Sequence, residues 1–160
     1  MLNVEEAVKW SRDVLRYGGL FYMDDFIGAS RFQWNDEQLR IATNVRSVFS
    51  KTKYLSDPNA NDKFLPIEIK KPDLEKFINS NPSEAADSDK ILDTIIKYFP
   101  NAEIQKTGGI IYHLVLSNML HNFDENNDKI LLDLLLLIDE LCIDLGQSHY
   151  GVALAIKEKM

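Results

Sequence analysis

The stretch NDKILLDLLLLIDELCIDL, residues 127–145, decides the predicted fold. It is too long and too apolar for a strand, and Gly146 follows it as a stop signal, so we predict one long helix. When the helix is drawn at about 100° per residue, one broad side is continuously apolar. We expect this side to face the core, and its members are Leu137, Ile130, Leu141, Leu134, Leu145, Ile138, Leu131, Cys142 and Leu135.

A second, narrower apolar stripe lies on the opposite side of this helix, between two acidic edges. The stripe is Leu132, Leu136 and Ile143, and the acids beside it are Asp128, Asp133, Asp139, Glu140 and Asp144. A helix that is apolar nearly all round is usually buried in a bundle, so another helix of the domain could cover the stripe. Alternatively, the stripe is an exposed patch that takes an apolar anchor of a partner, while the acids pair with its Lys or Arg.

Helix-capping residues and the spacing of apolar residues predict further helices. Asn3 and Asn35 each stand three residues before a Glu or Gln, in the form of a capping box. The expected helices begin after these caps, end near Gly18 and Ser50, and are joined by others over 73–79, 84–99, 110–122 and 148–159. Residues 20–34 have no clean period and are expected to be irregular, and a hairpin through 106–109 competes with the helix over 110–122.

These elements together predict an all-α fold, a single-domain bundle of about six or seven helices over residues 1–160. We expect Leu131, Leu134, Ile138 and Leu141 near its centre. A short β segment near 64–70 is compatible with this fold, although Pro66 keeps it off any central strand. The best boundary between two helical subregions lies within 51–72.

Composition excludes several broad classes of protein. The chain has 160 residues, 45% of them apolar and 27% charged, which is typical of a globular domain. Its longest apolar run has five residues, far fewer than the roughly 20 that a membrane span needs, and no signal peptide begins the chain. Cys142 is the only cysteine, so a disulfide within the chain is excluded. We expect a cytoplasmic protein.

The net charge of −7 is unevenly placed. Residues 1–80 hold 12 acids and 12 bases, whereas residues 81–160 hold 13 acids and 6 bases. A protein that binds a phosphate backbone usually shows the opposite sign on its working face, so direct nucleic-acid binding is not expected. The acidity either keeps the protein soluble or steers a basic protein partner toward it.

Two pairs of carboxylates have the spacing E-x-x-D, namely Glu84 with Asp87 and Glu125 with Asp128. Their spacing resembles that of the all-α nucleotide pyrophosphatases of the MazG type, in which such pairs on facing helices hold magnesium. This resemblance implies a magnesium-dependent hydrolase as the alternative function. Both pairs also lie at predicted helix N-termini, where acids are favoured without any metal.

Another polar set, His113, Ser117 and His121, falls on one face of the predicted helix over 110–122. The two histidines are about 12 Å apart along a helix, too far to share a metal ion, and we expect a polar seam. No constellation is therefore predicted as catalytic or metal-binding, and no cofactor is expected.

The whole profile resembles the immunity proteins that bacteria make against delivered toxins, including those of contact-dependent growth-inhibition systems. The resemblance rests on size, acidity and the lack of catalytic residues, and it implies a non-enzymatic inhibitor that binds a basic, nuclease-type toxin domain. It implies no contact with nucleic acid or membrane. The predicted contact surface is Asp128, Leu132, Asp133, Leu136, Asp139, Glu140, Ile143 and Asp144.

Overall fold

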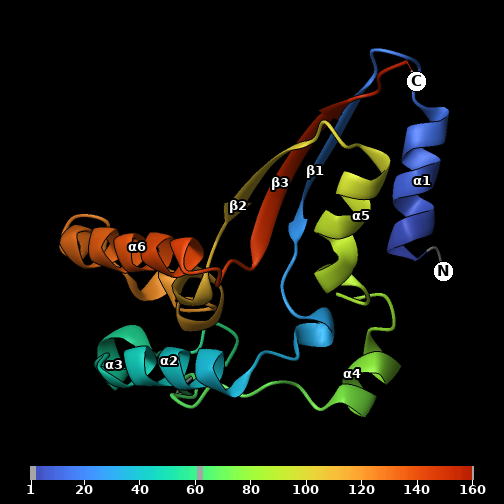
Figure 1. The fold of residues 1–160 in the computed structure, drawn as a ribbon. Helices are drawn as coiled ribbons and strands as arrows, with labels where there is room; N and C mark the ends of the chain where they lie inside the picture. Colours follow the sequence, from blue (N-terminus) through green and yellow to red (C-terminus); the bar gives the residue numbers. More distant parts are fainter. Residues whose placement is uncertain (1–2, 61–62, 160) are drawn as a thin grey trace. The chain divides into compact units, whose positions relative to one another are not determined.

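A computed structural model describes residues 3–60 and 63–159. The chain forms two compact units (Figure 1). Unit 1 comprises Met1–Gln33, Pro72–Thr107 and Ser148–Met160, and unit 2 comprises Trp34–Lys71 and Gly108–Gln147. The sequence predicted one domain with a boundary within 51–72, and one crossing between the units falls there, after Lys71. The other crossings lie near residues 33, 107 and 147.

Unit 1 contains a three-stranded antiparallel sheet, so the predicted all-α fold is wrong. The strands are β1 (Leu20–Phe26), β2 (Glu103–Thr107) and β3 (Tyr150–Ile156), and β3 lies between the other two. Leu20 pairs with Ile156 and Phe26 with Tyr150, while Glu103 pairs with Leu154 and Thr107 with Tyr150. The segment 148–159, predicted as a helix, therefore contains the central strand β3. Residues 20–34, expected to be irregular, contain the edge strand β1.

The sequence of β3 explains why it becomes a strand. Gly151, Ala153 and Ala155 alternate with larger residues, and these three small residues are the buried ones. Alternation with a period of two places all three on one face of the sheet. Small side chains on that face let covering helices approach closely, but they gave a weak apolar signal in the sequence.

Helices α1 (Val4–Val14) and α5 (Ile91–Tyr98) contribute to the core on that face of the sheet (Figure 1). Val8 of α1 and Ile95 of α5 pack with Phe99, Ala153 and Ala155. Both helices follow the sequence signals: Asn3 forms the predicted capping box with Glu6, and α5 ends just before Pro100. The first part of the predicted helix over 84–99 is instead a turn that leads into a short 3-10 segment, Ser88–Lys90. The rest of unit 1 includes α4 (Leu74–Ser80) and a 3-10 turn at Ser30–Phe32.

Unit 2 holds α2 (Asp36–Ser47), α3 (Lys51–Tyr54) and the long helix α6 (Lys129–Asp144). Asn35 caps α2 with Gln38 as predicted. The expected extended piece over 64–70 is reduced to one bridge between Phe64 and Ser56. The predicted helix over 110–122 is instead a π-helical turn, η3 (Ile111–Val115), followed by a 3-10 turn at Leu120–Asn122.

The segment 110–119 contributes much of the buried core of unit 2. Its fully or almost fully buried side chains are Ile110, Ile111, Leu114, Val115, Leu116 and Met119. By contrast, Leu134 and Leu141 of α6, which were predicted near the centre, are about half exposed, at 51% and 54%. Helix α6 forms where predicted, but it presents a different side to the core.

Opposite charges hold the two ends of the η3 segment. Asp139 of α6 accepts hydrogen bonds from backbone N–H groups at the start of the segment, and Arg46 of α2 donates to the carbonyls of Leu114, Val115 and Ser117 at its end. An anion at a helix N-terminus and a cation at a helix C-terminus both interact favourably with the helix dipole. Both side chains are buried, so these contacts fix the segment between α2 and α6.

Candidate protein-binding surface

Helix α6 exposes a continuous apolar stripe. Its five members recur at intervals of four or three residues, which places them on one side of the helix. Their exposed fractions are 85% for Ile130, 51% for Leu134, 53% for Leu137, 54% for Leu141 and 80% for Leu145. Isolated exposed leucines are ordinary, but a row of five on one helix marks a surface suited to protein contact.

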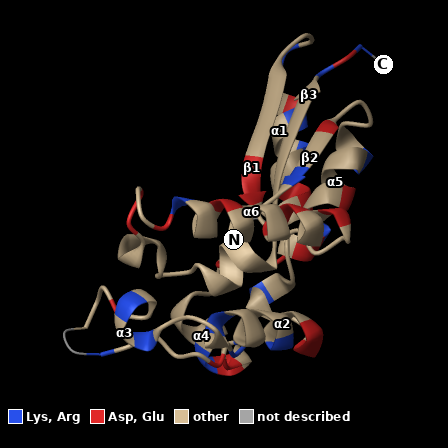
Figure 2. Ribbon diagram, turned by 90° about the vertical axis from the view of Figure 1, so that its left-hand side faces the viewer, with Lys and Arg blue, Asp and Glu red and all other residues tan. Residues whose placement is uncertain are grey.

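Acidic side chains border this stripe along one edge. Asp133, Glu140 and Asp144 are exposed, and Leu136 lies beyond them with 45% of its surface exposed. Asp133 forms an ion pair with Lys129 one turn earlier. Within the described part of the chain, no ion pair involves Glu140 or Asp144. The stripe, these three acids and Leu136 are called the α6 face below, and Figure 2 shows where acidic and basic residues lie along the ribbon.

The eight residues predicted as the contact surface do not lie together. Asp133, Leu136, Glu140 and Asp144 belong to the exposed α6 face, whereas Leu132 and Ile143 are half-buried. Asp128 and Asp139 are buried, with 5% and 4% of their surfaces exposed. The predicted second stripe is thus largely turned inward, and much of the predicted core side is turned outward.

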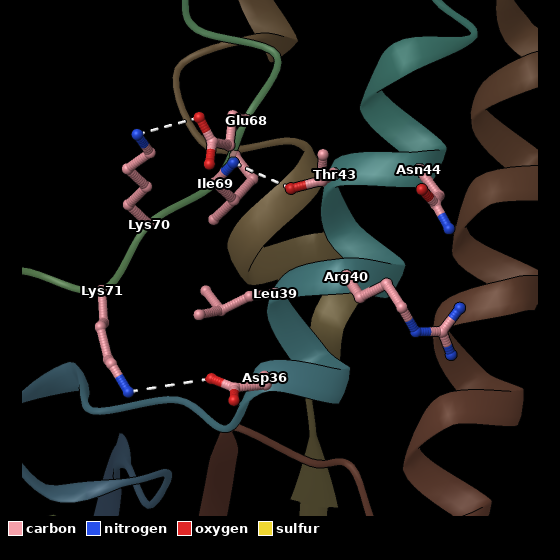
Figure 3. A pocket seen from close by; sticks show the side chains of 9 residues that line it. All are labelled: Asp36, Leu39, Arg40, Thr43, Asn44, Glu68, Ile69, Lys70 and Lys71. Carbon is pink, nitrogen blue, oxygen red and sulfur yellow. Dashed lines mark hydrogen bonds and ion pairs between the residues drawn. The ribbon is translucent and has the colours of Figure 1, made fainter.

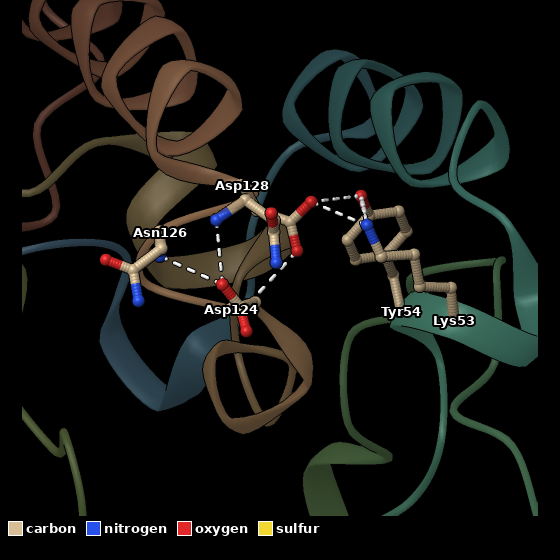
Figure 4. Close-up of polar contacts among 6 residues, drawn as sticks. Lys53, Tyr54, Asp124, Asn126 and Asp128 are labelled. Atoms are coloured by element: carbon tan, nitrogen blue, oxygen red, sulfur yellow. Dashed lines mark hydrogen bonds and ion pairs between the residues drawn. The ribbon is translucent and has the colours of Figure 1, made fainter.

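Asp128 belongs to a polar network at the start of α6 (Figure 4). Its carboxylate accepts hydrogen bonds from Lys53 Nζ at 2.6 Å, from the Tyr54 hydroxyl at 2.8 Å and from the backbone N–H of Asp124 at 3.0 Å. These bonds, that of Lys53 first, lower the pKa of Asp128 to about 2. Because α3 and α6 meet through these bonds, Asp128 supports the unit and does not offer a free charge to a partner.

Asp139 has a comparable structural role in the middle of α6. One carboxylate oxygen accepts the N–H of Gly109 at 2.7 Å, and the other accepts those of Ile111 and Tyr112 at 2.8 and 2.9 Å. A side chain on Gly109 would place its Cβ 2.8 Å from Asp139 Oδ1, so any larger residue would have to displace this carboxylate. Sequence reasoning placed Asp139 on the surface because an acid in an apolar helix usually marks the wet side.

The surface of unit 2 also has a groove between α2 and residues 68–71, with a volume of about 540 Å³ (Figure 3). Leu39 and Ile69 contribute its apolar lining, and Thr43 accepts the N–H of Ile69. Ion pairs from Lys70 to Glu68 and from Lys71 to Asp36 lie beside it. Arg40 points away from residues 68–71 in this view. The charged residues that line the groove are of both signs, so their charges favour no particular class of ligand.

The residues predicted as a polar seam lie in different surroundings. His113 packs edge-on against Trp34, with 5.5 Å between the ring centroids. Burial lowers the pKa of His113 to about 4, so its imidazole is neutral at pH 7. Ser117 and His121 are exposed.

The two E-x-x-D pairs lie in turns, whereas the predicted kind of magnesium site needs them on helices. Glu84 and Asp87 belong to unit 1, and Glu125 and Asp128 to unit 2. Each pair lies in a turn before a helix, so neither presents two carboxylates on one helix face. Asp87 pairs with Lys90, as Asp128 does with Lys53. Over residues 3–60 and 63–159, no three or more His, Cys, Asp or Glu side chains are placed to hold a metal ion.

No helix in the described part of the chain has both the length and the apolar character that crossing a membrane requires. No protein-family model, curated protein or solved structure matches the chain.

Proposed function

We propose that this chain is a non-enzymatic binding protein of the immunity or antitoxin class, which acts in the cytoplasm on a basic, nuclease-type toxin domain. The observation that carries the proposal is the α6 face, where the stripe of exposed apolar residues runs beside three exposed acids. The apolar row supplies anchoring contacts, and the acids supply charge selection. Asp128 and Asp139 hold the helix in place beneath this face.

The apolar row offers a useful amount of binding energy. Complete burial of a leucine side chain contributes about 1.5–3 kcal/mol, so covering a half-exposed one contributes about 1 kcal/mol. Stripe residues such as Leu137 and Leu141 would then act as the central anchors of an interface. A partner helix with its own apolar row, or an apolar ridge, suits this geometry.

The acids decide the kind of partner. Glu140 and Asp144 are one turn apart and present two adjacent negative charges beside the leucines. A second copy of the chain would bring a like-charged border to the same place, which opposes self-association through this face. A partner with Lys or Arg beside an apolar ridge gains both attraction on approach and pairing in the complex.

The test begins with a photo-crosslinking residue in place of Leu137, which captures the native partner in the source cells. The purified partner is then titrated by calorimetry with the unmodified chain and with the double variant Glu140→Lys/Asp144→Lys. We expect at least tenfold weaker binding for the variant. The control Glu84→Lys/Glu158→Lys reverses the same amount of charge at exposed positions outside the helices, and we expect less than a twofold change.

Protection of cells tests the inhibitory role separately. Cells that produce the partner should stop growing, and production of this chain should restore growth, whereas the Glu140→Lys/Asp144→Lys variant should not. If both double variants bind alike, the α6 face is not the contact. If the chain binds the partner but never restores growth, the immunity role is wrong.

A further inference from the structure

The outer edge of β1 is a side of the unit 1 sheet along which the structure places no further strand of the described chain. Strand β1 is an edge strand because, among residues 3–60 and 63–159, β3 is the one strand that pairs with it. At one end Ile27 N–H donates to the His149 carbonyl, and at the other Lys157 N–H donates to the Gly19 carbonyl. In an antiparallel pair, every second residue forms backbone hydrogen bonds with the neighbouring strand. Since Gly19 and Ile27 both bond to β3 or its flanks, the odd-numbered residues of β1 bond to β3, and the backbone groups of the even-numbered residues point outward.

These outward groups belong to Leu20, Tyr22 and Asp24. In the part of the chain that the structure describes, no hydrogen bond outside the sheet involves their backbone N–H or carbonyl groups. The N–H of Phe26, at the end of the strand, already donates to the Asp25 side chain. An incoming strand therefore finds three consecutive outward positions that are ready to pair.

The side chains of the same positions form an exposed apolar patch. Leu20 and Tyr22 are 56% and 60% exposed, and each pairs across the sheet with an exposed residue of β3, Ile156 and Leu154 respectively. This is the sheet face opposite the one that packs on α1 and α5. A strand added beside β1 would therefore gain apolar contacts with Leu20 and Tyr22 as well as backbone hydrogen bonds.

The charges at this edge select the occupant. Natural edge strands are usually protected against pairing with other strands by lysine, proline or a bulge. Strand β1 has no lysine or proline, and its charged residues are Asp24 and Asp25. Antiparallel pairing of Leu20, Tyr22 and Asp24 with the same positions of a second copy sets each Asp24 opposite a Leu20, so neither carboxylate gains a basic partner. A strand with Lys or Arg opposite these two residues pairs favourably with them.

We propose that the outer edge of β1 binds an extended segment of a protein partner as a fourth strand. The segment runs antiparallel to β1, has basic residues opposite Asp24 and Asp25, and has apolar residues opposite Tyr22 and Leu20. This site lies in unit 1, whereas the α6 face lies in unit 2. It goes beyond the proposed function, because either surface could bind without the other.

The probe is the blocked peptide Lys-Lys-Thr-Val-Thr-Val, titrated into the isotope-labelled full chain and followed by amide NMR. We expect saturable shifts of the amide signals of Leu20, Tyr22 and Asp24. The peptide with Glu-Glu in place of Lys-Lys should bind at least tenfold more weakly. If the first peptide causes no shift at millimolar concentration, or the acidic peptide binds equally well, the proposal is wrong.

Two proline variants separate the two edges of the sheet. Tyr22→Pro removes an outward N–H of β1 and leaves the pairing with β3, so we expect at least tenfold weaker peptide binding. Lys106→Pro is the matched control, because the alternation at β3 turns Lys106 outward on the edge formed by β2. Equal loss of binding in both variants would overturn the assignment to β1.

Asp24→Lys provides a second route if Tyr22→Pro fails to fold. It changes only an exposed side chain and should also weaken peptide binding at least tenfold. Unchanged binding by a folded Asp24→Lys variant would overturn the charge selection. Sedimentation of the free chain tests the other occupant, and concentration-dependent dimers abolished by Tyr22→Pro would show that β1 pairs with itself.

Discussion

Asp139 and Glu140 are neighbours in the sequence but differ in surroundings. Successive residues on a helix are rotated by about 100°, so one carboxylate can point into unit 2 while the next points to solvent. The Asp139 carboxylate accepts three backbone N–H groups, and Glu140 is exposed. The sequence predicted both as members of one exposed contact surface. The buried position of Asp139 makes that expectation wrong.

Asp139→Asn should therefore destabilise the protein. The asparagine keeps one acceptor oxygen but turns an NH₂ group toward a backbone N–H of the η3 segment, leaving at least one buried donor unpaired. We expect a loss of about 2–3 kcal/mol in the free energy of unfolding, measured by urea denaturation. Glu140→Gln is the matched control and should change stability by less than about 0.5 kcal/mol. Equal stability of the two variants would contradict the structural role of Asp139.

Asp128 should make stability depend on pH at the acid end. Its pKa is lowered from an ordinary value of 3.8 to about 2 in the folded chain, chiefly by the hydrogen bond from Lys53. The unfolded chain then binds the proton more readily than the folded chain does. The stabilisation is complete above about pH 5 and is lost as the pH falls toward 2.

Asp128→Asn removes this carboxylate and should flatten that part of the profile. The measurement is the urea midpoint of unfolding between pH 5 and pH 2 for the unmodified chain and the variant. Glu125→Gln changes a nearby carboxyl that is exposed and should keep the original slope. A slope that survives in Asp128→Asn would assign the acid sensitivity to other groups.

At the scale of the element, the helices with local signals were predicted well. The capping boxes at Asn3 and Asn35 are present, and α6 lies within one or two residues of its predicted limits. These features depend on residues within a turn or two, so the sequence contains the information. The side of α6 that faces inward depends on the 110–119 segment, and the apolar residues surround α6 too widely to identify that side.

Two alanine substitutions in α6 should show which side of the helix faces the core. Leu135 is 4% exposed and Leu137 is 53% exposed, although the sequence placed both on the core side. We expect Leu135→Ala to lower the free energy of unfolding by about 2–4 kcal/mol, because it leaves a cavity. Leu137→Ala should cost less than about 1 kcal/mol, since solvent already reaches that site. Chemical denaturation measures both, and similar losses would support the predicted orientation.

At the scale of the whole molecule, the sheet was beyond the reach of local patterns. Its strands come from residues 20–26, 103–107 and 150–156, and every pairing joins segments far apart in the chain. β3 was predicted as a helix because its buried side consists of Gly151, Ala153 and Ala155, which give little apolar contrast. The candidate surface was predicted in part: Asp133, Leu136, Glu140 and Asp144 are exposed, while the leucine stripe beside them was assigned to the core.

The charge of the whole chain leads to a prediction about binding kinetics. The excess of acids lies in residues 81–160, which include α6 and carry 13 acids against 6 bases. The Debye length falls from about 10 Å at 0.1 M salt to about 3 Å at 1 M, so long-range attraction to a basic partner is screened while buried apolar contacts remain. We expect the association rate constant to fall at least tenfold between 0.05 and 1 M salt, with a dissociation rate constant that changes less than threefold. Stopped-flow fluorescence with the captured partner measures both.

The double variant Glu140→Lys/Asp144→Lys should reduce the salt dependence of association more than Glu84→Lys/Glu158→Lys does, because only the first pair borders the apolar stripe of α6. An association rate that is independent of salt would show that charge plays no part in recognition.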